Sequence, residues 1–328
     1  MKNRFRLVAA AAGASALLLS APYALAAAQQ TDPVQVITHV KTLAAFDFAA
    51  GEAPENITVN PDGSLTLSML GSVAGKQPEL VRISRSGHRT VLVTGRMGDT
   101  ITGNTRDDDG TIYYNVASAD ASRVGVWKAP PGGTPHRLAA LPSDALPNGL
   151  ALDPSGRTLY VADSHKSTVW IIPTAGGPAT AWLTDPALAP TPDVPLGANG
   201  LRFHNGAVWV SNLSKGTLLR IPVTAKGTPG PAKVVTDKLP GADDFSFLSR
   251  RYDVVFATEN GPNQIAVVSP KGAVKTVLTA ADGLTSPTAT AVRGNRLYIT
   301  DAGLNEPHTA KLQTGHIDLS ALRADRTR

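Results

Sequence analysis

Short apolar runs separated by turn residues recur along almost the whole chain. The clearest example lies between Pro147 and Thr184, where four such runs follow one another. Each run contains β-branched or aromatic residues and is bounded by Gly, Pro, Asp or Ser. This pattern is typical of short strands joined by tight turns. The stretch therefore predicts a four-stranded antiparallel meander.

The same unit is repeated six times. Aligned on the polar residue that opens the first run, the units begin at or near Glu55, Thr102, Asn148, Asn199, Asp243 and Thr288. The successive spacings are 47, 46, 51, 44 and 45 residues. A period near this length, with four strands per unit, is typical of β-propellers. We therefore predict an all-β fold, a six-bladed β-propeller with four antiparallel strands per blade.

The last unit lacks a fourth strand, because Lys311 to Leu319 is followed by a polar, basic end of the chain. The stretch from Val34 to Val40 precedes the first unit and has strand character. We expect this N-terminal strand to complete the last blade, which closes the ring and removes two free sheet edges. Two separate β domains are the alternative, but no linker interrupts the period.

The first 26 residues have the features of a secretory signal peptide. A basic start precedes an apolar run over residues 7–19, and Ala24-Leu25-Ala26 has the small-x-small pattern of a cleavage site. The apolar run is too short for a membrane span, which needs roughly 20 residues. We expect a signal peptide at 1–26, one propeller domain at 27–320 and a polar tail at 321–328. The mature protein is then secreted, in the periplasm or outside the cell.

Composition excludes several classes of function. The net charge is +5, and removal of the three basic residues of the signal peptide leaves 28 basic and 26 acidic residues. The sequence contains no basic cluster of the kind that binds nucleic acid. We expect a small-molecule substrate and no membrane span. The chain has no cysteine, which excludes a thiol nucleophile and thiolate metal sites. The oligomeric state is not indicated by the sequence.

The residues that open the inner strands carry the candidate chemistry. Apolar residues two and four positions later pack between blades, so alternation turns the opening residue toward the propeller axis. Four of the opening residues bear carboxylate or amide oxygens: Glu55, Asn148, Asn199 and Asp243. Oxygen ligands without nitrogen or sulfur suit a hard divalent cation such as Ca²⁺ or Mg²⁺. Alternation selects Asp243 in the fifth unit, with Asp244 as the alternative.

These residues give the chain a resemblance to a known family. With Glu55, Pro147-Asn148-Gly149-Leu150, Asn199-Gly200-Leu201 and Asp243, it resembles the regucalcin–gluconolactonase family of six-bladed propellers. The resemblance implies a divalent metal held by the Glu, Asn and Asp of units one, four and five, with Asn148 as a fourth ligand or substrate contact. Ca²⁺ is the expected metal, and Zn²⁺, Mn²⁺ and Mg²⁺ are alternatives.

The chain also departs from that family. Its first unit opens with Pro54-Glu55-Asn56-Ile57, and its fifth unit has Asp243-Asp244 where the family has Asp-Gly. The substrate-binding Arg of the family's second blade has no match, and Asn104 and Arg106 are the nearby polar candidates. Other candidate substrate contacts are His165 and His308, in loops expected on the metal-binding face, and Glu259. Either histidine can instead be an exposed loop residue without a role in function.

Two functions follow from these observations. The first is an exported divalent-metal-dependent hydrolase of the gluconolactonase type, which opens a lactone or related ester. Its catalytic residues are Asp243, as base or nucleophile, and Asn148. The alternative is a non-catalytic propeller that binds a ligand or partner and holds a structural calcium.

Overall fold

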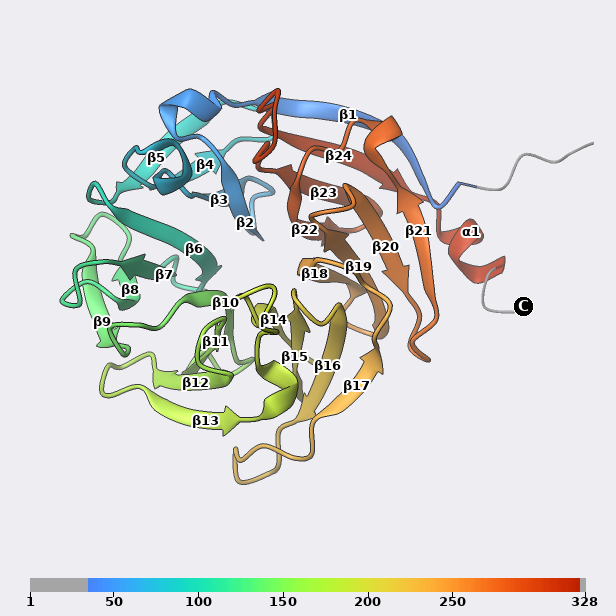
Figure 1. The fold of residues 1–328 in the computed structure, drawn as a ribbon. Helices are drawn as coiled ribbons and strands as arrows, with labels where there is room; N and C mark the ends of the chain where they lie inside the picture. Colours follow the sequence, from blue (N-terminus) through green and yellow to red (C-terminus); the bar gives the residue numbers. More distant parts are fainter. Residues whose placement is uncertain (1–34, 325–328) are drawn as a thin grey trace, which may run out of the picture. The chain divides into compact units, whose positions relative to one another are not determined.

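The structure is a computed structural model that describes residues 35–324. The predicted signal peptide therefore lies outside the described residues. Six four-stranded antiparallel sheets follow one another around a central axis, as blades (Figure 1). The predicted six-bladed β-propeller is confirmed.

In each of the first five blades the strands follow chain order from the axis outward. The strands of blades 1 to 3 are β2 (Pro54–Val59), β3 (Leu65–Met69), β4 (Glu79–Ile83), β5 (Arg89–Thr94), β6 (Asp99–Arg106), β7 (Ile112–Ser118), β8 (Gly125–Ala129), β9 (His136–Ala140), β10 (Pro147–Leu152), β11 (Thr158–Asp163), β12 (Thr168–Pro173) and β13 (Thr180–Thr184).

The strands of blades 4 to 6 are β14 (Ala198–His204), β15 (Ala207–Asn212), β16 (Thr217–Pro222), β17 (Lys233–Thr236), β18 (Ala242–Ser249), β19 (Tyr252–Glu259), β20 (Gln264–Val268), β21 (Val274–Leu278), β22 (Pro287–Arg293), β23 (Arg296–Asp301), β24 (Lys311–Ile317) and β1 (Ile37–Ala45). Short 3₁₀ helices lie in the connections, at η1 (Phe48–Ala50), η2 (Ser72–Ala74), η3 (Pro186–Leu188) and η4 (Ala280–Asp282).

Blade 6 takes its outermost strand from the N-terminal side of the chain. The strand order β1-β24-β23-β22 places β1 beside β24, and Figure 1 shows it along the outer edge of that blade. The strand starts at Ile37 and reaches Ala45, so it begins later and ends later than the predicted Val34–Val40 stretch. The difference arises because Thr42 to Ala45 continue the pairing as far as Lys311 at the start of β24.

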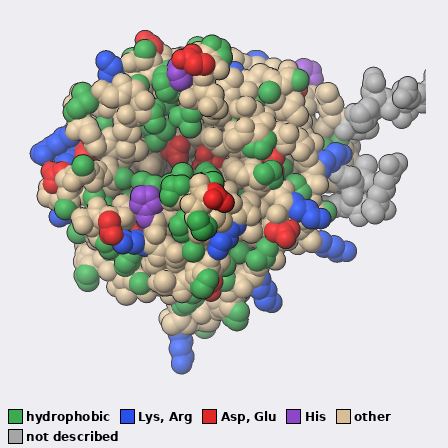
Figure 2. Space-filling view, viewed as in Figure 1, with side chains coloured by type: hydrophobic (Ala, Val, Ile, Leu, Met, Phe, Trp, Pro, Cys, Tyr) green, Lys and Arg blue, Asp and Glu red, His purple; other side chains and the backbone are tan. Residues whose placement is uncertain are grey.

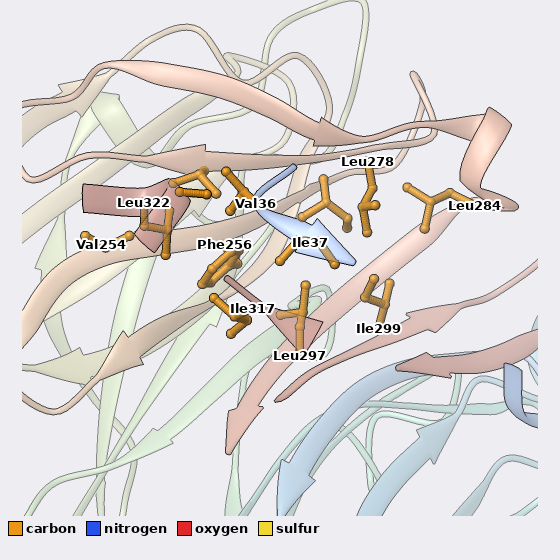
Figure 3. Close-up of a cluster of buried hydrophobic side chains, with 13 residues drawn as sticks. Val36, Ile37, Val254, Phe256, Leu278, Leu284, Leu297, Ile299, Ile317 and Leu322 are labelled. Carbon is orange, nitrogen blue, oxygen red and sulfur yellow. The ribbon is translucent and has the colours of Figure 1, made fainter. Parts of the chain in front are cut away.

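The hydrophobic core lies mainly between the blades. Figure 3 shows one such cluster, where Phe256 of β19 and Leu297 of β23 meet Ile37 of β1. Helix α1 (Leu319–Ala324) adds Ala321 and Leu322 to this cluster. These two residues, expected in a polar tail from 321 onward, are therefore packed against the propeller, because their apolar side chains cover the gap between blades 5 and 6.

Hydrogen bonds from second strands to neighbouring inner strands tie adjacent blades together. The Asn115 amide donates to the main-chain oxygen of Asn148 (2.6 Å), and the Thr258 hydroxyl donates to that of Thr288 (2.9 Å). The Ser211 hydroxyl donates in the same way to the main-chain oxygen of Asp243. Buried main-chain oxygens near the axis thus find partners across the blade boundaries.

Candidate metal centre

A β-bulge occurs at the opening residue predicted for every inner strand, which is the second residue of the strand in five blades and the fourth residue of β6 in blade 2. In blade 3, Pro147 pairs with Asp163 and Leu150 with Val161, so Asn148 and Gly149 together face one residue of the partner strand. The same extra residue is found at the opening position of the other five inner strands. Bulges bend a strand and redirect its side chains, and they are common beside functional sites. The six bulges therefore set the direction of the opening side chains.

Glycine follows the opening residue in three of the bulges. A Cβ atom on Gly103 would lie 2.2 Å from the main-chain oxygen of Asn148, and one on Gly149 would lie 2.5 Å from that of Asn199. A Cβ atom on Gly200 would lie 2.4 Å from Oδ1 of Asp244. Because no other side chain fits these positions, glycine allows consecutive inner strands to approach closely at the axis.

We call Glu55, Asn148, Asn199 and Asp243 the axial ring. The four residues open β2, β10, β14 and β18, and each is at most 9% exposed. Figure 2 shows acidic side chains at the floor of a hollow in the middle of one face. Glu55 and Asp243 are close enough for their charges to interact, and the Asn199 side chain reaches the Asp243 carboxylate.

The opening residues of the other two blades, Thr102 and Thr288, make hydrogen bonds to neighbouring blades. The Thr102 hydroxyl donates a hydrogen bond to the main-chain oxygen of Pro147 (2.7 Å). The Thr288 hydroxyl donates to the main-chain oxygen of Pro54 (2.8 Å). Both threonines join their blade to the next one. The four residues of the axial ring therefore carry the oxygen-rich side chains among the six opening positions.

Asp244, the alternative to Asp243, is tied to two other blades. Its Oδ2 accepts hydrogen bonds from Nη2 of Arg202 in blade 4 and from Nδ2 of Asn56 in blade 1, both at 2.5 Å. Its Oδ1 accepts from the Phe245 N–H (2.7 Å). Asn56, Arg202 and Asp244 thus form a polar link between inner strands of three blades, which we call the crossbeam. Asp244 has a full set of partners, whereas Asp243 does not.

Burial shifts the pKa values of the acidic groups at the axis upward. Burial raises the pKa of Glu55 to about 7, and the nearby Asp244 carboxylate adds to the rise. The pKa of Asp243 is raised well above its usual range by burial, and the charges of Glu55 and Asp244 raise it further. Burial also raises the pKa of Asp244, but the Arg202 guanidinium opposes that rise. One guanidinium thus faces three carboxylates, which leaves the Glu55 and Asp243 charges uncompensated when ionised.

Two oxygens of the axial ring are buried without a hydrogen-bond partner: Oδ1 of Asn199 and Oδ1 of Asp243. Buried polar atoms usually have a hydrogen-bond partner or a bound ion, so we expect these two oxygens to bind one. A hard divalent cation fits, because the ring offers carboxylate and amide oxygens and two uncompensated negative charges. Between residues 35 and 324, no three His, Cys, Asp or Glu side chains gather as a metal site. The axial ring contains only two residues of those types, and its other two are amides.

The proposed substrate contacts lie in varied surroundings. Glu259 ends β19 opposite Ala242, one residue before Asp243, and is 2% exposed. Burial raises the pKa of Glu259 to about 7. Asn104 occupies the position that is Leu150 or Phe245 in other blades, and its amide donates to the Ser68 hydroxyl (2.9 Å). Asn104 therefore lies between blades 1 and 2, while its Oδ1 has no partner.

The two loop histidines make local contacts. His165 is exposed, and its Nδ1 lies 3.3 Å from the main-chain oxygen of Asp144. The ring of His308 stacks on Phe48 at a centroid distance of 4.2 Å, and its Nε2 lies 3.0 Å from Oε1 of Glu306. Neither histidine has a contact with the axial ring in these interactions, and their part in substrate binding stays a prediction.

Three residues near the axis are absent from the sequence-based candidates. Two belong to the crossbeam, Asn56 and Arg202. The third is Asn260, which the sequence places on the metal-binding face without a role, and whose Nδ2 lies 3.4 Å from Oδ2 of Asp243. The sequence did contain a sign of the crossbeam. Asp244 stands where the bulges of blades 2 to 4 have glycine, which departs from the family pattern. A carboxylate at that buried position requires a partner, and Arg202 provides it.

Comparisons with known proteins agree with the fold. The sequence profile of the NHL repeat matches residues 145–172 in blade 3. A search of curated proteins by sequence finds no match. Among solved structures, an auxiliary nutrient binding protein from Bacteroides ovatus is similar, with a TM-score of 0.67 and 10% identity over 85% of this chain and 76% of that chain.

Two further structures come from the class suggested by the axial residues. A putative gluconolactonase has a TM-score of 0.62 and 16% identity over 86% of this chain and 92% of its own. A calcium-binding protein, regucalcin, from Agrobacterium tumefaciens has a TM-score of 0.61 and 18% identity over 85% of this chain and 94% of its own. At these identities the likeness shows a shared propeller fold. In residues 35–324, no helix is long and apolar enough to cross a membrane.

Proposed function

We propose that the protein is a divalent-metal-dependent hydrolase that opens a lactone or a related ester at the axial ring. The observation that carries this proposal is the pair of buried, unpartnered oxygens on Asn199 and Asp243, beside a second carboxylate on Glu55. The likeness to a putative gluconolactonase and to regucalcin supports the class of reaction and the kind of metal.

Glu55, Asn199 and Asp243 would hold the metal, with Asn148 as a fourth ligand or as a substrate contact. When bound, the metal supplies a positive centre that polarises a carbonyl group. Ca²⁺ suits this all-oxygen set best, and Mg²⁺, Mn²⁺ or Zn²⁺ are alternatives. The predicted signal peptide supports a place of action outside the cytoplasm.

The chain itself would handle the proton. With Oδ1 of Asp243 directed to the metal, the second oxygen of the carboxylate, Oδ2, would accept a proton from a water molecule as the water oxygen adds to the carbonyl carbon, and the Asn260 amide, which donates to Oδ2, would orient it. The acyl–oxygen bond then breaks, and the proton passes to the departing alkoxide, so that the products are an acid and an alcohol. The Asn148 amide can donate a hydrogen bond to a substrate oxygen.

Turnover of a panel of lactones and simple esters tests this proposal. The purified protein is stripped with a chelator and then assayed with Ca²⁺, Mg²⁺, Mn²⁺ or Zn²⁺ restored one at a time. We expect ring opening of at least one lactone that is lost with the chelator and recovered with one metal. Absence of turnover on the whole panel with every metal would overturn the hydrolase.

The second candidate is a propeller that binds a small molecule with a structural calcium and performs no reaction. The similar structure of a nutrient binding protein favours it. One metal per chain without turnover on the panel would support this candidate. The two functions are thus distinguished by the same set of measurements.

A further inference from the structure

A basic pocket lies on the blade that closes the ring. It has a volume of about 330 Å³ and is lined by His39, Lys41, Asn295, Arg296, Thr314, Gly315 and His316. Four of the seven lining residues are basic, and none is acidic. Their strands β1, β24 and β23 lie side by side in Figure 1. The pocket therefore collects positive charge from three strands of one sheet.

The strand register explains why these side chains meet. His316 pairs with Arg296 on one side and with Thr38 on the other. Lys41 pairs with Thr314, two residues before His316, because a bulge lies between Thr38 and Lys41. Residues two apart on a strand share a face, so this bulge returns Lys41 to the face that carries Arg296 and His316.

The positive charge has little compensation. Lys41 and Arg296 make no ion pair with any residue between 35 and 324, whereas several arginines elsewhere are paired. The Asp318 carboxylate lies close enough to His316 for their charges to interact. Its Oδ1 already accepts from the Ser320 hydroxyl and from the N–H groups of Ser320 and Ala321. Two full positive charges therefore remain available in the pocket.

The backbone conformation of His39 is independent evidence for a binding site at this pocket. Its φ angle is +53°, a left-handed conformation that is uncommon for residues other than glycine. Such conformations cost free energy and cluster at functional positions. His39 lies in the β1 bulge, and its Nδ1 lies 3.0 Å from the Thr38 hydroxyl, so Nε2 remains free for a ligand.

We propose that this pocket binds a phosphate group, either as the free ion or as part of a larger phosphoester. Arg296 can donate two parallel hydrogen bonds to phosphate oxygens, and Lys41 supplies a point charge. The imidazoles and the Asn295 amide add further donors. The ligand would contact β1, β23 and β24 together, so it would hold the N-terminal strand in the ring. The site is separate from the axial ring and does not rest on the proposed hydrolase.

Thermal unfolding in phosphate tests this site. At equal ionic strength and pH 7, we expect saturating phosphate to raise the Tm by about 3 °C relative to chloride, because a ligand of the folded state stabilises it. The double variant Lys41→Gln/Arg296→Gln should lose this rise. The control Lys226→Gln/Lys233→Gln removes the same charge from exposed positions of blade 4 and should keep it. His316→Gln, a second variant, should lower the phosphate affinity several-fold.

Two arms distinguish the sources of the phosphate group. Inorganic phosphate is titrated by calorimetry, and co-sedimentation is measured with phosphatidylglycerol vesicles against phosphatidylcholine vesicles. Loss of either interaction in the Lys41/Arg296 variant, but not in the blade 4 control, would identify that source. No interaction in either arm, or equal interaction in both double variants, would overturn the proposal. Far-ultraviolet circular dichroism of each variant without phosphate confirms that it is folded.

Discussion

Asp243 and Asp244 are neighbours in the chain and are both almost completely buried, but their surroundings differ. Asp244, in the crossbeam, has an arginine, an amide and a main-chain N–H as partners. Asp243, in the axial ring, keeps an oxygen without any partner and lies beside the Glu55 carboxylate. The crossbeam has the charge pairing of a structural link, whereas the axial ring has the excess negative charge of a cation site. Burial alone does not separate the two roles, but the set of partners does.

The largest effect is expected from Asp244→Asn. Loss of this carboxylate leaves the Arg202 guanidinium poorly paired in a mostly buried position, and breaking a buried ion pair costs about 3–5 kcal/mol. Chemical denaturation of the metal-free protein measures the loss of unfolding free energy. The double variant Arg202→Met/Asp244→Leu removes both charges and should be less destabilised than Asp244→Asn. A loss below about 1 kcal/mol for the single variant would contradict the structural role of the crossbeam.

The pH dependence of the unfolding free energy should show that the axial ring, unlike the crossbeam, has uncompensated negative charge. The pKa of Glu55 is about 7 in the folded protein and 4.5 as a free side chain, so the folded state holds the proton more tightly. The metal-free protein should therefore become less stable as pH rises from about 4.5 to 7, by up to about 3 kcal/mol from this residue. Denaturation at several pH values measures the slope.

Glu55→Gln provides the control for this dependence. The slope should become smaller in the variant, although not zero, because Glu259 and Asp301 also have pKa values raised to about 7. A divalent cation should stabilise the wild type more at pH 7 than at pH 5, since protons compete with it for the carboxylates. An unchanged slope in Glu55→Gln would show that Glu55 is already ionised at low pH and has a partner.

The substitution Asp243→Asn is expected to have a slightly smaller effect, in this case on the free energy of metal binding. Loss of one of two charged ligands should weaken the binding of the metal at least about 100-fold, or about 2.7 kcal/mol. Because the change removes an uncompensated buried charge, the metal-free variant should be at least as stable as the wild type. Calorimetric titration with Ca²⁺ measures the affinity. Equal metal affinity in the variant and the wild type would exclude Asp243 as a ligand.

The smallest effect on stability is expected at the loop histidine of blade 3. The His165 side chain is exposed and makes one weak hydrogen-bond contact, so His165→Ala should change the unfolding free energy by less than about 0.5 kcal/mol. The Ca²⁺ affinity should be unchanged as well. A clear rise in KM for a lactone substrate, with the stability unaltered, would support the predicted substrate contact. A change in Ca²⁺ affinity would place His165 nearer to the axial ring than its contacts suggest.

The fold followed from the sequence because strand, turn and period repeat locally. The opening residues of the axial ring were found for the same reason, since Asn148 and Asn199 begin equivalent strands in the same register. The crossbeam could not be found in this way. Arg202 and Asn56 meet Asp244 only because the ring brings inner strands of three blades to one axis, and a repeat does not specify contacts between blades that are far apart in sequence.

The closing strand has a consequence for how the chain reaches its folded state. Each of the first five blades forms from a local segment, but Ile37 pairs with Ile317, which lies 280 positions later. Contacts between such distant residues carry the largest loop-closure entropy, so they form late and slowly. Until β1 arrives, the outer edge of β24 is an open template for a strand from another molecule. If β1 of one molecule pairs with β24 of another, the yield of refolded monomer should fall as the protein concentration rises. Dimers that have exchanged this strand are the expected by-product.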